Sequence, residues 1–567
     1  MTANDIRNIA LLGHGGSGKT SLAEQMLYMT KGIDRLGRTA DGNTTCDYDA
    51  EEIKRKISIS LAFAPVKYQG VKINVMDAPG NFDFAGEAVC AIRAAECAVL
   101  VGSAKDGLSV GMERSWKMLG KKPRMIFINR TEEENSDYAA CLEAIKAKFG
   151  QSIVPLVAPV IGGNKAVTAI VDLLHNKAYD AKGECPIPAD MADDVEALRA
   201  ELMEAAAGSD EELMEKFFDT MELSDEEMAK GLKIGVRDGS ICPVLCGSAV
   251  TGLGVEMLMQ TIVDLVPVAT DMPAVPAEDD DGNAIEVAYD PNGTAAALVF
   301  KTISDQYGKY SVVKVVRGKI KSDMSLYNVT TGNTEKIGRL YVMKGKKGEE
   351  TKEICCGDIG AIGKMDKVKT GDTLCEPKTY VKFAPIYPEY NRNRMLTVTK
   401  MKSYPKDNDK SWNCSAVSYD VVKMLQDLPH LEAIGATASN YRENYVEVPD
   451  NNEPISITPL YTDAGFWKVF TFRFLHGKPF TQADIDAKRR EVVLPVSVAR
   501  KIFATDDVVG RRFNMDAQEY RVCGVVEDVS AATPSSVGDM WLPITLNSWV
   551  TSDATGKLVG SVGIYMT

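Results

Sequence analysis

The stretch Gly13-His14-Gly15-Gly16-Ser17-Gly18-Lys19-Thr20 decides the fold of the first part of the chain, because it fits the phosphate-binding pattern G-x-x-x-x-G-K-[ST]. The apolar run Ile9-Ala10-Leu11-Leu12 precedes it and predicts a buried strand, and residues 21–27 predict a helix. In this context the glycines let backbone N–H groups surround phosphate oxygens. Lys19 would reach the outer phosphates, and the Thr20 hydroxyl would bind Mg²⁺. The alternative interpretation is a glycine-rich turn before a helix.

Length and composition describe a protein of several domains. The chain has 567 residues, of which 45% are hydrophobic and 25% charged, as is ordinary for globular proteins. The net charge of −14 argues against a general nucleic-acid binder but leaves room for a local basic face. The 12 scattered cysteines predict buried thiols in a reducing compartment. We expect no signal peptide and no membrane-spanning segment, since no stretch approaches about 18 apolar residues.

Polar motifs follow two further apolar strands. Residues 71–76 predict a strand that ends at Asp77-Ala78-Pro79-Gly80, where Asp77 would hold Mg²⁺ through water and the Gly80 amide would meet a γ-phosphate. Residues 57–61, 97–101 and 123–128 also predict strands, and the last ends at Asn129-Arg130-Thr131-Glu132. An open parallel sheet binds ligands at the carboxyl ends of its strands. The sequence therefore predicts an α/β domain with a mostly parallel sheet.

The order G-H-x-x-x-G-K-T, D-x-P-G, N-R-T-E and the later Cys246-Gly247-Ser248-Ala249 resembles the translational GTPases, most of all bacterial elongation factor G and its paralogues. The resemblance implies GTP or GDP with Mg²⁺ as ligands, with phosphates bound by residues 13–20, Asp77 and Gly80. It implies guanine recognition by Asn129, Arg130, Glu132, Ser248 and Ala249. The family's mobile switch corresponds to residues 41–60, here called the switch segment, and its magnesium-binding threonine falls at Ser58. Thr20, Ser58 and Asp77 are thus the implied metal site.

Several residues depart from the family pattern. Glu132 replaces an aspartate and is one methylene longer, and Arg130 replaces a lysine, so its planar head would stack over the base. Asn81 stands where the family has the histidine that positions the attacking water, and Lys56 stands where it has glycine. Asparagine can hydrogen-bond water but cannot become a cation. We therefore expect GTP binding with slow hydrolysis, with Lys19 and Asn81 as the catalytic candidates. The alternative is a GTP-binding module without turnover.

The resemblance also implies a domain order. A P-loop GTPase domain is expected at 1–270, with an insert at about 155–240 that looks helical, and a linker rich in proline and acidic residues at 271–292. Short strands and glycine turns predict an antiparallel β-barrel at 293–385, with the F-K-T, G-D-I-G-A and G-D-T-L runs of domain II of elongation factor G. The implied partner is the ribosome, through rRNA and ribosomal proteins, and the implied location is the cytoplasm.

Residues 386–567 resemble a different family. The order F-x-x-x-F, L-x-G-[KR]-x-F, A-R-x-[IL]-F and V-x-G-V-V-x-D resembles the extracytoplasmic core domain of ABC transporter permeases of the macrolide-exporter and lipoprotein-release type. This implies an α+β domain, a periplasmic setting and an origin in a transporter complex; the alternative is an unrelated α+β domain. Because the two resemblances imply different compartments, we expect a composite of a truncated factor and a soluble permease-like domain. A third hypothesis is that an exporter accessory domain is the functional part.

Overall fold

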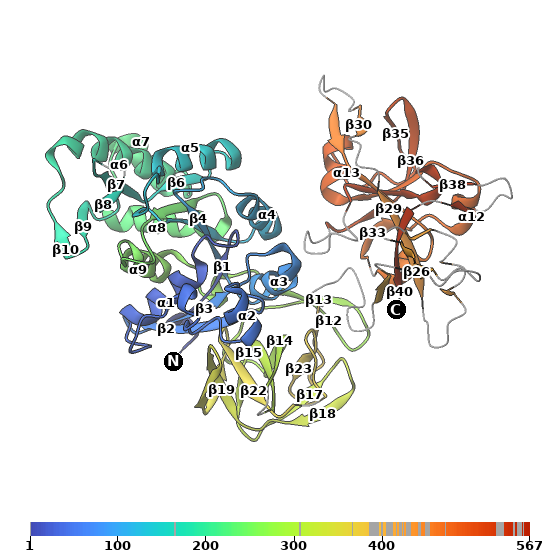
Figure 1. Cartoon of the computed structure of the whole chain (residues 1–567), viewed down its shortest axis with the longest axis horizontal. Coiled ribbons are helices and arrows are strands. Elements are labelled where there is room, and N and C mark those ends of the chain that lie inside the picture. The colour runs from blue at the N-terminus through green and yellow to red at the C-terminus, as the bar shows by residue number, and fades with distance from the viewer. Residues whose placement is uncertain are drawn as a thin grey trace. The chain divides into compact units, whose positions relative to one another are not determined.

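The computed structural model describes most of the chain: residues 2–163, 166–305, 308–365, 367–384, 396–398, 401–403, 412–414, 417–418, 422, 425–426, 433–439, 444–447, 454–470, 472–528, 538–547, 550–552, 558–559 and 561–566. The chain divides into two compact units, residues 1–386 and 387–567, and each is described by itself (Figure 1). The predicted boundary at 385–386 lies outside the described residues.

A seven-stranded sheet forms the centre of the first unit, in the order β2-β3-β1-β4-β5-β11-β6. Its strands are β1 (Ile6–Leu12), β2 (Ala62–Tyr68), β3 (Val71–Asp77), β4 (Cys97–Ser103), β5 (Arg124–Asn129), β6 (Ile153–Pro155) and β11 (Cys242–Cys246). All neighbours are parallel except β2 with β3. Every residue of β1, β4 and β5 is buried, as a parallel sheet covered on both faces requires. The predicted α/β domain is confirmed.

Helices follow the strands of this sheet: α1 (Lys19–Met29), α2 (Ala50–Arg55), α3 (Ala85–Ala94), α4 (Val110–Leu119), α5 (Tyr138–Phe149) and α9 (Val255–Leu265). Helix α1 packs against α9, β2 and β3, while α3 packs against β1 and α4 against β4. Ser109 and Asp137 cap the helices that follow them by accepting backbone N–H groups with their side chains. Strands and helices thereby alternate along the chain, which places every strand-to-helix loop after β1, β4 and β5 at one edge of the sheet.

The strand predicted at 57–61 is wrong, because β2 begins only at Ala62. Glu52 on α2 accepts the N–H groups of Ile59 and Ser60, each at 3.0 Å. Glu87 accepts the N–H of Leu61 at 2.7 Å. Because carboxylates take these donors, the segment does not pair with a neighbouring strand.

The insert is only partly helical. Its first half forms an antiparallel sheet of β7 (Val157–Ile161), β8 (Val167–Asp172), β9 (Lys177–Asp180) and β10 (Gly183–Cys185), in the order β10-β9-β8-β7. Its second half holds α6 (Ala192–Ala207), α7 (Glu211–Thr220) and α8 (Asp225–Asp238). Asp210 and Ser224 cap the last two helices by accepting backbone N–H groups with their side chains. The helical prediction is therefore wrong for 157–185, where β7 and β8 are rich in β-branched residues.

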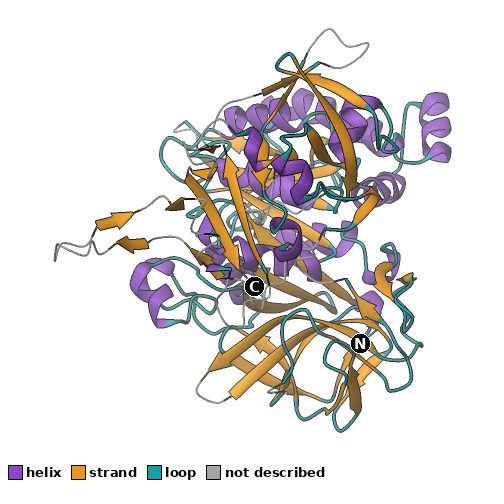
Figure 2. Ribbon diagram, turned by 90° about the vertical axis from the view of Figure 1, so that its right-hand side faces the viewer, coloured by secondary structure: helices purple, strands orange, loops and turns teal. Residues whose placement is uncertain are grey.

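A second, all-strand domain completes the first unit (Figure 2). Its eight-stranded antiparallel sheet has the order β18-β17-β23-β14-β15-β22-β19-β20. The strands are β14 (Ala296–Asp305), β15 (Gly308–Arg317), β17 (Ser325–Asn328), β18 (Asn333–Lys336), β19 (Leu340–Lys344), β20 (Lys347–Thr351), β22 (Ile359–Gly363) and β23 (Thr373–Cys375), beside the pair β16 (Lys319–Lys321) and β21 (Glu353–Cys355). The predicted linker contains a hairpin, β12 (Val275–Glu278) and β13 (Ala284–Val287), which pairs with β24 (Lys382–Phe383). The predicted antiparallel β architecture is confirmed.

Two buried ion pairs join the parallel-sheet domain to the all-strand domain. Lys314 Nζ lies 2.6 Å from Glu96 Oε1, and Lys72 Nζ lies 2.8 Å from Asp358 Oδ1. Asn8 Nδ2 donates to Glu96 Oε2 at 2.6 Å, so both oxygens of that carboxylate are satisfied. Paired and hydrogen-bonded charges of this kind tolerate burial, whereas a single one would not. The contact between the two domains therefore depends on charge matching as well as on apolar packing.

The second unit is an α+β domain around one large sheet, as the sequence predicts. The main path of the sheet is β25-β40-β29-β32-β37-β34-β36-β35-β30-β31, with β28 also pairing β40 and β33 pairing β36. Its strands are β25 (Leu396–Val398), β28 (Val417–Ser418), β29 (Ile434–Ser439), β30 (Asn444–Val446), β31 (Ile455–Ile457), β32 (Pro459–Thr462), β33 (Phe474–Gly477), β34 (Glu491–Pro495), β35 (Arg512–Met515), β36 (Gln518–Val526), β37 (Met540–Pro543) and β40 (Ser561–Met566). Outside it lie the pairs β26 (Met401–Ser403) with β27 (Trp412–Cys414) and β38 (Thr551–Ser552) with β39 (Leu558–Val559).

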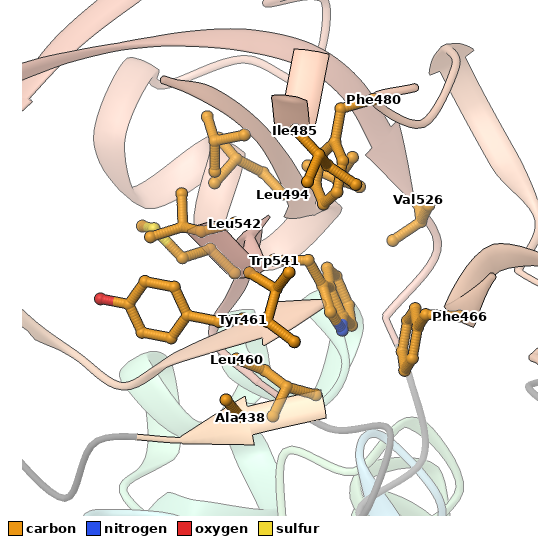
Figure 3. Packing of buried hydrophobic residues seen from close by; sticks show 14 of the residues in the cluster. Ala438, Leu460, Tyr461, Phe466, Phe480, Ile485, Leu494, Val526, Trp541 and Leu542 are labelled. Carbon is orange, nitrogen blue, oxygen red and sulfur yellow. The ribbon is translucent and has the colours of Figure 1, made fainter. Parts of the chain in front are cut away.

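Aromatic side chains fill the core of the second unit. Trp541 on β37 is fully buried in a cluster that also contains Phe466 and Leu542 (Figure 3). Its ring centroid lies 5.1 Å from that of Phe472 and 6.0 Å from that of Trp467. The helices α11 (Phe466–Val469), α12 (Gln482–Asp486) and α13 (Val496–Phe503) contribute Phe466, Ile485 and other side chains to the same cluster. Among the described residues of the chain, no helix combines the length and apolar character needed to cross a bilayer.

Candidate functional site

A cavity of about 500 Å³ opens where the chain leaves the carboxyl ends of β1, β3, β5 and β11. This size suits a nucleotide-sized ligand. Of the residues predicted from the sequence, those that line it are His14, Gly15, Gly16, Gly18, Lys19, Thr20, Ser58, Gly80, Asn81, Asn129, Arg130 and Ala249. Gly13, Ser17, Asp77, Glu132 and Ser248 lie outside the lining. The structure thus brings segments more than 200 residues apart in the sequence to one site.

Residues 13–20, the phosphate loop, wrap around the side chain of Lys19. Lys19 Nζ donates to the carbonyl oxygens of Gly13 at 3.1 Å and His14 at 2.9 Å. Burial lowers the pKa of Lys19 to about 8, and the nearby carboxylates of Asp77 and Asp47 oppose that shift. An anion that took over these hydrogen bonds would restore the charged form. The loop is therefore built to receive negative charge at the N-terminus of α1.

Three side-chain oxygens that could bind a metal ion lie close together beside the phosphate loop. Thr20 Oγ1 donates to Asp77 Oδ2 at 2.7 Å and lies 3.1 Å from Ser58 Oγ. Asp77 ends β3, and burial raises the pKa of its carboxyl to about 7. Hydroxyl and carboxylate oxygens are the ligands that Mg²⁺ prefers. Thr20, Ser58 and Asp77 would hold the ion together, with Asp77 acting directly or through water.

Asn129 joins the phosphate loop to the loop after β11. Its Nδ2 donates to Ser17 O at 2.9 Å, and its Oδ1 accepts the Ala249 N–H at 2.9 Å. Gly18 has φ +94°, and a Cβ there would collide with the Asn129 amide. Ser248 is buried, and its Oγ accepts the N–H groups of Val250 and Thr251. Asn129 and Ala249 are therefore held together with the phosphate loop by hydrogen bonds, and Ser248 fixes the turn that follows it.

Arg130 and Glu132 differ in their relation to the cavity, since only Arg130 lines it. Arg130 has φ +64°, and its guanidinium pairs with Glu133 at 3.2 Å and Asp106 at 3.5 Å. Glu133, rather than Glu132, lines the cavity. The Oε2 atom of Glu132 is nevertheless buried without a hydrogen-bond partner. A buried carboxylate oxygen in this condition needs a donor, which the N–H groups of guanine would supply.

Other unpartnered buried atoms test whether a magnesium-bound guanine nucleotide fits the site. Ser17 Oγ in the phosphate loop and Asp77 Oδ1 at the end of β3 are both buried with no partner among the described residues. Together with Glu132 Oε2 they lie in the three motifs that the family uses for phosphate, metal and base. Buried polar groups left unpaired cost free energy, so they point to an external ligand. The residues present fit GTP or GDP with Mg²⁺.

Asn81 lies close above the phosphate loop. A Cβ built on Gly15 would come within 2.8 Å of Asn81 Oδ1, and both residues line the cavity. The neutral amide can donate to or accept from a water but cannot take its proton and hold a charge. The adjacent His14 ring packs edge-on against Phe82, at 6.2 Å between centroids.

The sequence did not point to several residues that line the cavity: Thr39, Asp47, Ile57, Glu133 and Val250. Asp47 is buried, and burial raises the pKa of its carboxyl. Its acidic character within the switch segment was the only available signal. Glu24 on α1 holds this segment by accepting the N–H groups of Gly37 at 3.2 Å and Thr45 at 2.8 Å. The position of Asp47 thus depends on contacts distant in sequence.

Comparisons with known proteins agree with this geometry. Residues 4–268 match the elongation factor Tu GTP binding domain, 294–377 match elongation factor G domain 2, and 385–563 match the MacB-like periplasmic core domain. Elongation factor G from two strains of Ureaplasma parvum serovar 3 is 33% identical over 382 residues, which cover 66% of this chain and 55% of the relative. The chain therefore spans about half the length of the curated relatives it matches.

A solved structure of a protein from Thermus thermophilus shares the fold, with a TM-score of 0.61 and 23% identity, over 93% of this chain and 81% of that one. The N-terminal part of the chain is thus elongation factor G-like, with a GTP-binding domain of the elongation factor Tu type followed by a domain of the elongation factor G domain 2 type. A MacB-like domain follows it.

Proposed function

We propose that the first unit binds GTP or GDP with Mg²⁺ and hydrolyses GTP slowly, as an elongation factor G-like protein that acts on the ribosome in the cytoplasm. The observation that carries this proposal is a set of three buried atoms without a hydrogen-bond partner among the described residues, Ser17 Oγ, Asp77 Oδ1 and Glu132 Oε2, one in each of the three motifs whose loops form the cavity. We further propose the domain limits 1–270 for the GTPase domain and 293–385 for the second domain. Rapid turnover is not expected, because Asn81 replaces the water-positioning histidine of the family.

The protein's own residues would divide the work as follows. Backbone N–H groups of the phosphate loop and Lys19 bind the phosphates, and Thr20, Ser58 and Asp77 hold the metal ion. When bound, GTP supplies the phosphoanhydride that is cleaved, and Mg²⁺ neutralises charge on its phosphates. Asn81 orients a water by hydrogen bonding but does not remove its proton. Catalysis by this chain therefore depends on positioning and charge stabilisation.

Nucleotide content and preference test the proposal directly. The purified protein should bind GTP and GDP in the presence of Mg²⁺ and should prefer them to ATP and XTP. Equal affinity for ATP would contradict guanine recognition by Asn129 and Glu132. Single-turnover GTP hydrolysis with and without ribosomes then tests the partner; an unchanged rate with ribosomes would contradict it.

A GTP-binding module without turnover is the second candidate, and Asn81 is the observation that favours it. Asn81→His introduces the residue that the resemblance implies at a position that lines the cavity beside Gly15. If slow hydrolysis results from Asn81, the variant should hydrolyse GTP at least about tenfold faster, in the range of a positioned general base. A rate that stays at zero in both proteins would favour the binding module.

A further inference from the structure

Lys56 holds an unusual backbone conformation at the end of α2. It is the C-cap residue of that helix, its φ is +56°, and its N–H donates to Glu52 O. This left-handed conformation favours glycine and strains a residue with a Cβ. The resemblance to elongation factor G implies glycine at this position. A lysine in this place therefore gives up backbone stability that glycine would keep, which points to a use for its side chain.

The Lys56 side chain is a free cation at the nucleotide cavity. It lines the cavity together with Lys19, Gly80 and Asn81. The structure shows no ion pair or hydrogen bond of its side chain with any described residue. By contrast, Lys54 and Arg55 on the same helix pair with Glu51, at 3.7 Å and 2.8 Å. Glu51 thus neutralises Lys54 and Arg55, whereas the Lys56 ammonium group at the cavity is available to bind a ligand.

The chain holds Lys56 at the phosphate end of that cavity. It stands two residues before Ser58, whose Oγ lies 3.1 Å from Thr20 Oγ1 in the implied metal site. Glu52 fixes the turn that follows by accepting the N–H groups of Ile59 and Ser60. The base-binding scaffold around Asn129 belongs to other loops. Lys56 lines the same cavity as Ser58, Gly80 and Asn81, which belong to the motifs that would bind the metal ion and the terminal phosphate of a nucleotide.

We propose that Lys56 binds the terminal phosphate of a nucleoside triphosphate and sets the preference of this site for GTP over GDP. The inference rests on the proposed function, since it needs a guanine nucleotide in the cavity. The ammonium group donates hydrogen bonds to phosphate oxygens and adds a positive charge beside Lys19. A diphosphate has no group at that position, so it gains nothing from Lys56.

Affinity measurements for GDP and for the non-hydrolysable analogue with an imide between the β- and γ-phosphates test this role in the full chain with Mg²⁺. Lys56→Gln should weaken binding of the analogue about tenfold, as loss of one charge-assisted hydrogen bond near solvent predicts. Its affinity for GDP should stay within about twofold of the wild type. Lys56→Arg should keep most of the preference, because it keeps the charge.

Lys56→Gly and Lys54→Gln are the matched controls. Lys56→Gly should also lose the preference for the triphosphate, yet raise the midpoint of thermal unfolding because it relieves the left-handed strain. Lys54→Gln removes a cation from the same helix and should leave both affinities unchanged. Equal effects of Lys56→Gln on both nucleotides, or no effect on either, would overturn the inference while leaving guanine-nucleotide binding intact. A wild-type protein that binds neither nucleotide would overturn the proposed function itself.

Discussion

Replacing Lys314 by methionine should release the all-strand domain from the parallel-sheet domain. Lys314 and Glu96 are each only 3% exposed, and Lys314 Nζ also donates to Gly357 O at 2.9 Å. Methionine fills a similar volume but leaves the Glu96 carboxylate buried with Asn8 as its remaining partner. Removing one member of a buried ion pair typically costs about 3–5 kcal/mol, because the other charge is left uncompensated. The cost falls on the contact between the domains, since the two side chains come from opposite sides of it.

Hydrogen exchange measured by mass spectrometry on the full chain resolves where this cost appears. A loss of about 3–5 kcal/mol corresponds to an opening constant larger by about two to three and a half orders of magnitude. Backbone amides of β15 and β22 should therefore exchange about 10²- to 10³-fold faster in Lys314→Met. Peptides from residues 472–528 of the second unit should exchange as in the wild type and serve as an internal reference.

Lys319→Met provides the matched control for this prediction. Lys319 pairs with Glu353 at 3.8 Å, but the two side chains are 50% and 42% exposed, so about 0–1 kcal/mol is expected. The double variant Glu96→Gln with Lys314→Met should recover much of the loss, because no buried charge remains. If Lys314→Met accelerates exchange no more than Lys319→Met does, the ion pair does not hold the domains together.

Three further predictions concern the site and the second unit. Burial raises the pKa of the Asp77 carboxyl from 3.8 in the unfolded chain to about 7, so between these pH values the folded protein holds a proton that the unfolded chain has lost. Between pH 5 and 7 the free energy of unfolding of the nucleotide-free wild type, measured in urea, should therefore fall by roughly 2–3 kcal/mol relative to that of Asp77→Asn. A difference between the two proteins that stays constant over this range would refute the raised pKa. Glu132→Asn should lower the affinity for GTP at least about tenfold and raise the affinity for XTP, since an amide can donate to the additional carbonyl of xanthine. Competition binding measures both affinities, and an unchanged ratio of GTP affinity to XTP affinity would exclude a contact between Glu132 and the base. Trp541→Ala should lower the stability of the second unit by about 3–5 kcal/mol in thermal unfolding, because it removes a fully buried side chain. The nucleotide affinity of the first unit should stay unchanged, and a loss of nucleotide binding in this variant would contradict the independence of the two units.

Short sequence patterns correctly predict those helices, strands and turns that are specified by neighbouring residues along the chain. The phosphate loop and α1 follow from residues 9–27, because glycines and an apolar run specify a strand, a turn and a helix there. The helix α13 (Val496–Phe503) is also local in this sense, because its buried residues Val498, Ala499 and Ile502 recur at helical spacing. Residues 57–61 show the opposite case. Their alternation favours a strand, but Glu52 and Glu87 take the backbone donors, and Glu87 lies 26 residues away from Leu61. No pattern within the segment carries that information.

In the candidate site, too, the sequence predicts what local motifs specify and misses what depends on tertiary contacts. Asn129 was predicted as a base contact, whereas the structure also gives it the role of joining Ser17 O to the Ala249 N–H, across loops that only the folded sheet brings together. Glu133 lines the cavity because Arg130 adopts a left-handed conformation and turns the chain, which the motif N-R-T-E does not reveal. Motifs therefore identify which loops form the site, while tertiary contacts decide which side chain of a loop faces the ligand.

On the roles proposed for them, Asn81 and Lys56 act in the same direction on the bound triphosphate: Asn81 slows its hydrolysis, and Lys56 strengthens its binding. Asn81 cannot accept the proton of an attacking water, so it lowers the rate of hydrolysis. Lys56 adds a cation there and, as proposed, favours the triphosphate over the diphosphate. Both changes lengthen the lifetime of the triphosphate complex.

That lifetime also bears on the contact between the two domains of the first unit. The chain directly after the switch segment is tied to the all-strand domain, since the Gly345 N–H donates to Phe63 O at 2.8 Å. Glu87, which accepts the Leu61 N–H, pairs with Lys301 of the all-strand domain as well. A long-lived triphosphate complex that fixes the switch segment would therefore prolong this arrangement of the two domains. On the proposed roles, the property that Asn81 and Lys56 set is thus the lifetime of the bound state rather than the speed of turnover.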